Sequence, residues 1–426
     1  MEKAQCKLNS NLTRGDLPGA YFVPKCSGVI VIWLAMLNLI LGETAPATRS
    51  ASDSNAFGFK LHKVLSVMPG NYVMSPYSLH RVLSLAEEGA AGETAQQMSA
   101  LLHLEGKPNS DEGVKALLDS LRESAKSSQI AFQSTNHLWY RRGIGMEQSF
   151  ISKAKTNYGV TPEELDFTNP GKACTMMNQA ILVATRGRIK ELVSSDAIQK
   201  NTSLVLANTV YLMGAWSSRF EPLRTKLRPF WVAEEKKIRE VPTMLQTSSM
   251  SYMHGDGFAL LEMPISGDFS MVFLLPDERD GLVALESSLT LSLFETAMKQ
   301  LSSYEVTVLL PKFSFSMGGD FKPMIEALGA RRMWVDGSAD FPRISLQTPV
   351  RVSTLCHETT IEVNEVGAEA TAATMMPADP FADTSPRVHE MDKVRRVVFN
   401  ADHPFLFALR HSQSGLLLIM GRVNRP

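Results

Sequence analysis

The residues best suited to chemistry in this sequence are a histidine and a glutamate that stand together at His357 and Glu358. The segment HETTI begins like the H-E-x-x-H motif of zinc proteases, in which two histidines one helical turn apart bind the metal. Ile361 stands where the second histidine is needed, and the surrounding residues alternate like a β-strand, which holds such positions too far apart to share a metal. We therefore interpret His357 as a hydrogen-bonded structural histidine and predict no metal site.

Other catalytic motifs are also incomplete. The segment GDGFAL at Gly255 lacks the third glycine of a dinucleotide-binding turn. The sequence contains neither a G-x-S-x-G nucleophile elbow nor a P-loop. We therefore predict that the protein is not an enzyme and needs no cofactor.

An apolar run from Val29 to Leu41 follows a stretch with a positive balance of charge, and small residues stand at Ala45-Pro46-Ala47. The run is shorter than the roughly 20 residues that span a bilayer, so it suits the core of a signal peptide better than an anchor. The alternative is a buried helix or strand of the fold. We predict an N-terminal extension and signal peptide over residues 1–47, one domain over residues 48–426, and a secreted, extracellular protein.

Secretion bears on the cysteines and on one glycosylation motif. Cys174 and Cys356 remain after the predicted cleavage, and two cysteines so far apart do not form a disulfide framework. We predict buried or half-buried thiols, and a disulfide between them stays open. Asn201, in Asn-Thr-Ser, is an acceptor for N-glycosylation if it is exposed.

The net charge of −1 gives no broad attraction to nucleic acid or to anionic membranes. In the segment 110–128, Lys115, Arg122 and Lys126 are interleaved with Asp119 and Glu123, which is typical of an ordinary solvated helix face. The sequence therefore does not support glycosaminoglycan binding, and we expect a monomer.

The elements that must position these residues change character along the chain. Residues 75–104, 110–128, 149–160 and 174–193 carry the helical period of apolar residues. From residue 203 onward, strand-like runs dominate, at 203–216, 259–278, 305–317, 349–366 and 403–423, interrupted by one helix at 321–334. Helices first and strands later predict an α+β protein with large mixed sheets.

The last part of the fourth run continues into TIEVNEVGAEATAAT, residues 360–374. As a strand, it would place Ala368, Ala370 and Ala372 on one face. Such small side chains suit an exposed loop, and they would also fit into a sheet without a new cavity, with Gly367 as a hinge. From this stretch alone, a plain linker and a strand that inserts later are equally consistent.

Several motifs in order make the chain resemble the serpin family over about residues 55–426. An early helix motif has Ser75, Pro76 and Ser78 in place, and a later segment has Asn208, Gly214, Trp216 and Phe220. EMPISGDFSMVFLLPDE, VTVLLPKFSFS and the carboxyl-terminal ADHPFLFALRHSQSGLLLIMGRVNRP follow in family order, and HETTIEVNEVGAEATAAT resembles the hinge of members that inhibit proteases.

The resemblance implies a fold and a mechanism. The fold would have helices packed around three large β-sheets, with an exposed reactive loop at about residues 367–398. A target serine protease would attack this loop as a substrate and be held as a covalent acyl-enzyme while the loop inserts as a new strand into the main sheet. The alternative is a non-inhibitory serpin, a carrier, chaperone or hormone precursor, whose loop is cleaved without trapping.

The hinge matches the inhibitory pattern at Glu365 and Gly367, and ATAA, with Ala370, Ala372 and Ala373, meets the requirement for small residues. Val366 and Ala368 depart from the usual charged residue and hydroxyl residue, but both are compact. By resemblance, a gating group lies beneath and at the opening of the main sheet; its members are Ser75, Ser78, Asn208, Trp216 and His357. Met213 stands where many members have lysine.

The position of the cut can be counted in two ways. Counting from Gly367, as in inhibitory members, places the reactive bond at Phe381–Ala382, which suits a chymotrypsin-like protease. Counting back from Pro404 lands near Lys393, and a trypsin-like protease would then be offered Lys393, Arg395 and Arg396. These basic residues also fit a solvated charge cluster beside the next strand. Pro377 and Pro380 would be poorly tolerated in a central strand, although they would enter it late.

Overall fold

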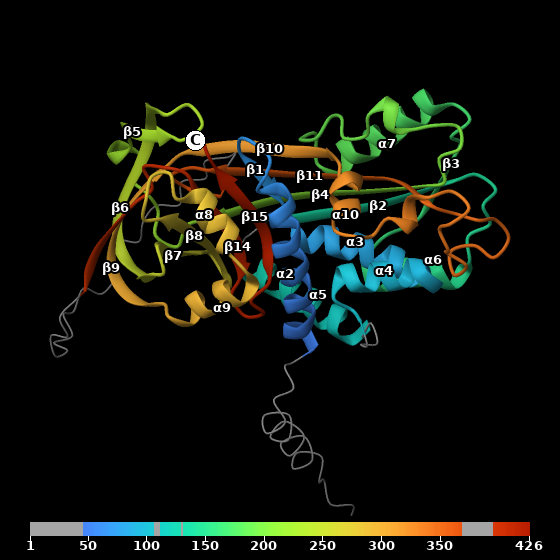
Figure 1. Cartoon of the computed structure of the whole chain (residues 1–426), viewed down its shortest axis with the longest axis horizontal. Helices are drawn as coiled ribbons and strands as arrows, with labels where there is room; N and C mark the ends of the chain where they lie inside the picture. Colours follow the sequence, from blue (N-terminus) through green and yellow to red (C-terminus); the bar gives the residue numbers. More distant parts are fainter. Residues whose placement is uncertain (1–45, 106–110, 129–130, 369–394) are drawn as a thin grey trace, which may run out of the picture. The chain divides into compact units, whose positions relative to one another are not determined.

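A computed structural model of the chain describes residues 46–105, 111–128, 131–368 and 395–426 (Figure 1). Its α-helices are α2 (Pro46–Leu65), α3 (Pro76–Gly89), α4 (Gly92–Leu102), α5 (Asp111–Ser128), α6 (Gln148–Tyr158), α7 (Pro170–Ala184), α8 (Leu282–Ser288), α9 (Leu291–Lys299) and α10 (Lys322–Ala327). Within these ranges, no helix combines the length and apolar character needed to cross a membrane.

Most strands lie after residue 203, as expected from the sequence, but the first three lie in the part that was expected to be helical. The strands are β1 (Tyr72–Met74), β2 (Ala131–Arg141), β3 (Glu163–Leu165), β4 (Leu204–Ala215), β5 (Lys226–Val232), β6 (Lys237–Gly255), β7 (Phe258–Ile265), β8 (Phe269–Pro276), β9 (Ser302–Pro311), β10 (Phe313–Asp320), β11 (Val352–Val363), β12 (Gly367–Ala368), β13 (Arg396–Asn400), β14 (Phe405–His411) and β15 (Leu417–Val423). The α+β class predicted from the sequence is confirmed.

Local sequence explains where the helices begin and end. At the start of α3, the Ser75 side chain accepts a hydrogen bond from the Ser78 backbone N–H, and Pro76 occupies the first turn. The expected helix over residues 174–193 is wrong at its carboxyl end, because α7 stops at Ala184. Arg186 and Gly187 have φ values of 53° and 82°, left-handed conformations that cannot continue a right-handed helix.

The strands form two β-sheets in the described part of the chain. One is six-stranded, in the order β10-β11-β12-β4-β2-β3, and the other is nine-stranded. The resemblance implies three sheets. Two of them are continuous with each other in the nine-stranded sheet because β6 is long: it pairs with β5 and β9 and then continues to pair with β7.

The six-stranded sheet is covered on both faces. In Figure 1, α7 lies on one side of strands β10, β11, β4 and β2, and α3, α4 and α6 lie on the other. The cluster under α7 joins Met177 and Ile181 to Trp139, Ala207 and Cys356. On the opposite face, leucines of β2, β4 and β11 share a core with α3. Because both faces are buried, β4 is a largely apolar run, LVLANTVYLMGA.

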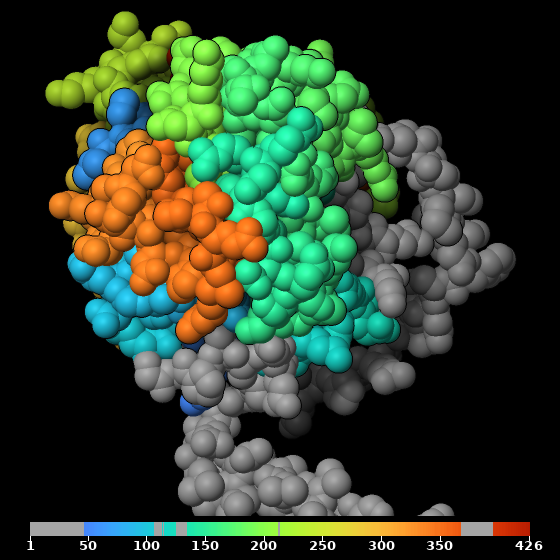
Figure 2. Space-filling view, turned by 90° about the vertical axis from the view of Figure 1, so that its right-hand side faces the viewer, coloured from blue at the N-terminus to red at the C-terminus, as the bar shows by residue number. Residues whose placement is uncertain are grey.

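Figure 2 shows the side of the molecule that lies on the right in Figure 1, near α6 and α7. The segment after α10 (orange) lies against the segment around α6 (teal), and the α7 region (green) lies beside them. Hydrogen bonds join the first two segments: the Glu147 N–H donates to the Ile344 oxygen (2.8 Å), and the Ser345 hydroxyl donates to the Ile144 oxygen (2.7 Å).

Candidate functional site

The central feature of the six-stranded sheet is the line along which β4 and β11 pair, which we call the seam. The two strands run parallel from Leu204 opposite Val352 to Val210 opposite Thr359, with a register shift between Val352 and Thr354. Beyond Thr359, the strands are no longer each other's partners, and the two residues of β12 lie between them. The two strands are therefore paired directly with each other at one end of the seam, whereas β12 lies between them at the other end.

Strand β12 is antiparallel to both of its neighbours. Ala368 lies opposite Val363 of β11 and opposite Gly214 of β4, while Gly367 lies opposite Ala215. A Cβ on Gly367 would lie 1.9 Å from the Gly214 carbonyl oxygen and 2.7 Å from the Ala215 Cα. Gly367 is therefore required by close backbone approach, which is a different role from the flexible hinge expected from the sequence.

A tight turn at 364–366 connects β11 to β12, and Trp216 holds it in place. The Trp216 indole Nε1–H donates to the Asn364 oxygen (2.9 Å), and the Trp216 backbone N–H donates to the Val366 oxygen (2.9 Å). The Phe220 N–H donates to the Glu365 oxygen (3.1 Å). The turn is thus fastened by three donors from the segment that follows β4.

Glu365 adds an electrostatic attachment to the same turn. Its carboxylate lies 2.9 Å from the Lys312 ammonium group and accepts a hydrogen bond from the Thr225 hydroxyl (2.8 Å). Partial burial opposes ionisation, but the hydrogen bonds and the charge of Lys312 lower the pKa of Glu365 overall. The family match at Glu365 therefore corresponds to a real ion pair with the residue between β9 and β10.

Beneath the seam lies a buried polar group centred on His357. The His357 Nδ1 lies 2.8 Å from the Asn208 Oδ1, and the Ser75 backbone N–H donates to His357 Nε2 (3.1 Å). An N–H donor at Nε2 and a carbonyl oxygen at Nδ1 assign the neutral tautomer with its proton on Nδ1. Burial lowers the pKa of His357 to about 3. The interpretation of His357 as a structural histidine agrees with this arrangement.

Ser75 and Ser78, which were predicted to belong to this polar group, are linked to it by hydrogen bonds in different ways. Ser75 joins it twice, through its N–H to His357 and through its hydroxyl, which donates to the Leu418 oxygen (2.6 Å). Ser78 is attached through Ser75 Oγ, and its own hydroxyl lies 2.9 Å from Ser134 Oγ of β2. Ser78 thus connects α3 to β2 and has no recorded contact with His357.

Sequence reasoning missed two members of this network. The Thr359 hydroxyl lies 2.9 Å from His357 Nε2, and the Asn208 side-chain nitrogen donates to Asn136 Oδ1 (2.6 Å). The position of Thr359, two residues after His357 in a strand, places both side chains on the same face and was an available signal. No comparable signal existed for Asn136, because only strand pairing brings β2 beside β4.

The buried polar group and the two cysteines are inaccessible from solution. His357 is completely buried, so it cannot reach a substrate in solution. Cys174 and Cys356 are free and buried, as predicted, and burial raises the pKa of Cys356 to about 12, which leaves an unreactive thiol. The described residues contain no group of His, Cys, Asp and Glu side chains arranged to hold a metal ion.

The other predicted site residues fall in three places. Ala370, Ala372, Ala373, Phe381, Ala382 and Lys393 lie outside the described residues, and so do the side chains of Ala368 and Met213. Asn201 is exposed in the turn before β4. Arg395 and Arg396 lie at the start of β13, where the Arg395 oxygen accepts from the Glu305 N–H (2.9 Å) and the Arg396 side chain pairs with Glu305.

A family model and several related sequences all indicate the same protein family. The family model described as "Serpin (serine protease inhibitor)" matches residues 52–426. An uncharacterized serpin-like protein of Thermococcus kodakarensis is 32% identical over 381 residues, which cover 87% of this chain and 84% of that protein. The leukocyte elastase inhibitor of Xenopus tropicalis is 30% identical over 385 residues, covering 88% and 99%.

Solved structures give the same result for the fold. The crystal structure of Serpin48, described as a highly specific serpin in the insect Tenebrio molitor, superposes with a TM-score of 0.76 at 26% identity. The match covers 88% of this chain and 98% of that one.

Proposed function

The chain belongs to the serpin family, and from this premise we propose that it is a secreted inhibitor of a serine protease that acts as a suicide substrate. The protease forms an acyl-enzyme with the loop after β12. The freed loop then continues the path of β12 down the seam and carries the tethered protease with it. The family model is described as a serine protease inhibitor and not as an enzyme, which supports the prediction that the protein is not an enzyme.

The position of β12 between β4 and β11 is the single observation that carries this proposal. A strand that descends from the end of β11 through a tight turn runs antiparallel to both neighbours. Further insertion would replace the parallel seam by two antiparallel ladders, and parallel pairing is slightly less stable per residue than antiparallel pairing. The exchange adds main-chain hydrogen bonds and buries side chains, which provides the free energy to displace the protease.

The polar group beneath the seam supports the same mechanism. His357 and Asn208 face each other across the paired strands, opposite one another in the register. A strand inserted between β4 and β11 must separate these two residues and break their hydrogen bond. The seam therefore resists opening until a full loop strand can replace what is lost.

We assign the reactive bond to Phe381–Ala382 and the target to a chymotrypsin-like protease. The length counted from Gly367 favours this bond, since a cut further along leaves slack that relieves the pull on the protease. The anchoring of Arg396 to Glu305 also argues against the second position, because a protease would have to detach β13 before binding there. Secretion rests on the apolar run from Val29 to Leu41, and the exposed Asn201 is the proposed site of glycosylation.

The test is incubation of the secreted protein with chymotrypsin and, separately, with trypsin. We expect a detergent-stable complex with chymotrypsin, and mass spectrometry should place the cut after Phe381. The variant Phe381→Arg should transfer complex formation to trypsin, while Arg396→Gln should leave both reactions unchanged. Cleaved inhibitor without any complex, from either protease, would overturn the proposal.

The non-inhibitory alternative is favoured by Pro377 and Pro380, which are unsuited to a central strand. Heating curves of intact and loop-cleaved protein separate the two functions. An inserting loop raises the melting temperature strongly after cleavage, whereas a loop that stays outside the sheet leaves it unchanged.

A further inference from the structure

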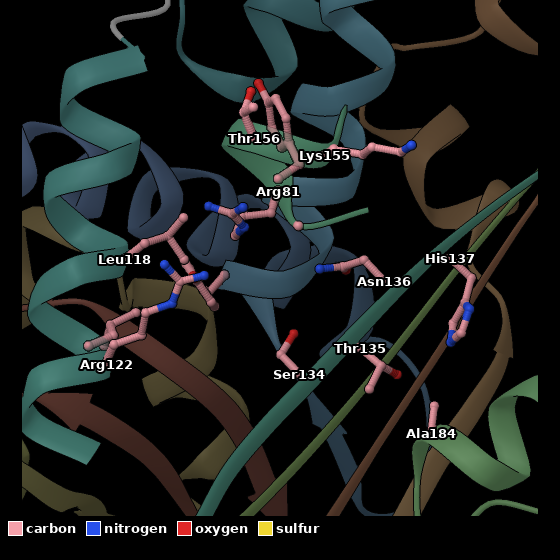
Figure 3. Close-up of a pocket in the computed structure, with 14 residues that line it drawn as sticks. Arg81, Leu118, Arg122, Ser134, Thr135, Asn136, His137, Lys155, Thr156 and Ala184 are labelled. Atoms are coloured by element: carbon pink, nitrogen blue, oxygen red, sulfur yellow. The ribbon is translucent and has the colours of Figure 1, made fainter. Parts of the chain in front are cut away.

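A pocket of about 470 Å³ lies apart from the seam and the hinge, among α3, α5, α6 and β2 (Figure 3). We call it the α5–α6 pocket. Its size falls in the range of sites that hold small molecules. Nothing in the proposed inhibitory mechanism uses its lining residues as a binding site.

The charge of the α5–α6 pocket has one sign. Arg81 of α3, Arg122 of α5 and Lys155 of α6 line it, and none of its fourteen lining residues is an aspartate or a glutamate. Arg122 is paired with Asp119 on the exposed side of α5 (3.6 Å), and Lys155 is exposed. Arg81 and Arg122, from two different helices, lie on the same side of this space, which favours an anion, whereas the Lys155 side chain extends away from them (Figure 3).

Arg81 is the unusual member because it is buried, with only 7% of its surface exposed. Its Nη2 donates to the Asn157 main-chain oxygen (2.9 Å), and its guanidinium lies 5.8 Å and 5.4 Å from the ring centres of Tyr77 and Tyr158. Among the described residues, no carboxylate forms an ion pair with Arg81. Because no carboxylate of the described residues forms an ion pair with this buried guanidinium, an anion bound from outside would supply a direct counter-charge.

The wall formed by β2 adds hydrogen-bond donors. Asn136 Oδ1 already accepts from Asn208, and Figure 3 shows the Asn136 side-chain nitrogen pointing into the space on the side of Arg81. His137, the next residue of β2, points to the opposite face of the strand, where its ring stacks on Trp139 (ring centroids 4.8 Å apart). β3 pairs with β2 only from Trp139 to Arg141, so the outer edge of β2 beside Asn136 and His137 carries no strand partner among the described residues.

The remaining wall is apolar. Leu118 and Leu121 of α5 line the pocket together with the rings of Tyr77 and Tyr158. Arg81 lies between this apolar wall and Asn136, as the labelled side chains in Figure 3 show. A ligand that satisfies both parts needs a single anionic head and an apolar body.

We propose that the α5–α6 pocket binds a small amphipathic carboxylate. The carboxylate accepts hydrogen bonds from the guanidinium of Arg81 and from the Asn136 amide. The planar guanidinium suits this role because arginine can bind both oxygens of a carboxylate at once. The apolar body packs on Leu118 and Leu121. A buried single guanidinium suits one compact head better than a long polyanion, whose many charges would need a row of exposed cations.

Calorimetric titration of the full chain with sodium decanoate tests the proposal. We expect one molecule bound per chain, and neither decanol nor decylamine should bind comparably. Arg81→Met, which keeps the apolar stem, should weaken decanoate binding at least about tenfold, the effect of losing a charge-assisted hydrogen bond. Lys172→Gln, an exposed position of α7 outside the pocket, is the matched control and should bind as the unmodified protein does.

A second variant keeps the test decisive if Arg81→Met does not fold. Arg122→Gln changes an exposed side chain and should weaken decanoate binding a few-fold while leaving the melting temperature of the free protein unchanged. Decanoate should also raise the melting temperature of the unmodified protein, because a ligand that binds only the folded state stabilises it. Equal binding of decanol, unchanged binding in both variants, or displacement of decanoate by a sulfated tetrasaccharide that binds more tightly would each overturn the proposal.

Discussion

At the scale of single residues, Gly367 decides whether β12 can occupy its place. In Gly367→Ala, the new Cβ would overlap the Gly214 carbonyl oxygen, so β12 must leave its position or displace β4. We expect a loss of about 1–3 kcal/mol in the free energy of unfolding, the usual cost of overpacking. We also expect more inhibitor molecules to be cleaved for each protease molecule trapped.

The measurement is a titration of protease activity together with urea unfolding. Gly171→Ala, in the first turn of α7, is the control because its new Cβ would meet only the Asn169 Oδ1 at 3.9 Å. The prediction is contradicted if the two variants give the same number of inhibitor molecules consumed for each protease molecule.

Three buried histidines make the folded state sensitive to acid. Burial lowers the pKa of His357 to about 3 and those of His62 and His80 to about 4. Because these pKa values lie below the unfolded value of about 6.5, the unfolded chain binds more protons between the two. The associated stability is complete above about pH 6.5 and falls as the pH drops toward 4.

At pH 5, each histidine should cost roughly 1–2 kcal/mol of unfolding free energy relative to pH 7.5. Urea unfolding at several pH values measures this slope. The variant His80→Asn should be less stable at every pH but show a shallower slope, because one proton-binding group is gone from the unfolded chain. A slope equal to that of the unmodified protein would exclude His80 from this effect.

At the scale of elements, the turn between β11 and β12 depends on the segment that follows β4. Trp216 is 2% exposed, and its indole N–H is the donor to the Asn364 oxygen. Trp216→Phe keeps an aromatic ring against Phe220 but removes this donor. We expect a loss of about 1 kcal/mol in the free energy of unfolding, since the carbonyl of the half-buried Asn364 loses this donor.

Hydrogen exchange of the amides at 364–368 should increase in Trp216→Phe, because the turn loses one of its attachments. Trp231→Phe removes an exposed hydrogen bond from the Trp231 indole to Asp280 and is the matched control. Unchanged exchange at 364–368 would show that the Trp216 side chain is not what fastens the turn.

At the scale of the whole molecule, Arg422 joins segments from both ends of the chain. In the interior, Arg422 Nη1 lies 3.2 Å from both oxygens of Glu286, and its guanidinium also donates to the main-chain oxygens of Ser66 (3.0 Å) and Gly70 (2.9 Å), which follow α2. Arg422 and Glu286 are each only 3% exposed. Burial raises the pKa of Glu286 even though Arg422 opposes this effect.

We expect Arg422→Met to lose about 3–5 kcal/mol of unfolding free energy, because Glu286 is left as an uncompensated buried charge. The double variant Arg422→Met with Glu286→Met should recover part of that loss, since the unpaired charge is also removed. Urea unfolding of the two single variants and the double variant measures the coupling. Additive losses would show that the two side chains do not act as a pair.

The sequence alone determined what depends on local chemistry and on the order of motifs. The α+β class and the two buried thiols could be predicted from residue types and their periodicity, the non-catalytic interpretation of His357 from an incomplete motif, and the serpin family from the resemblance of several motifs in order. Helix ends were less certain, as α7 shows, because a single pair of left-handed residues outweighs a continuing apolar pattern.

Only the tertiary structure decided which distant residues meet. Lys312 and Glu365, and likewise Asn136 and Asn208, become partners because sheet formation places separate strands side by side. The role of Gly367 changed from flexibility to close packing for the same reason, since its constraint comes from the backbone of β4. The α5–α6 pocket arises in the same way, from helices and a strand whose positions are fixed by packing of the core and not by any local sequence signal.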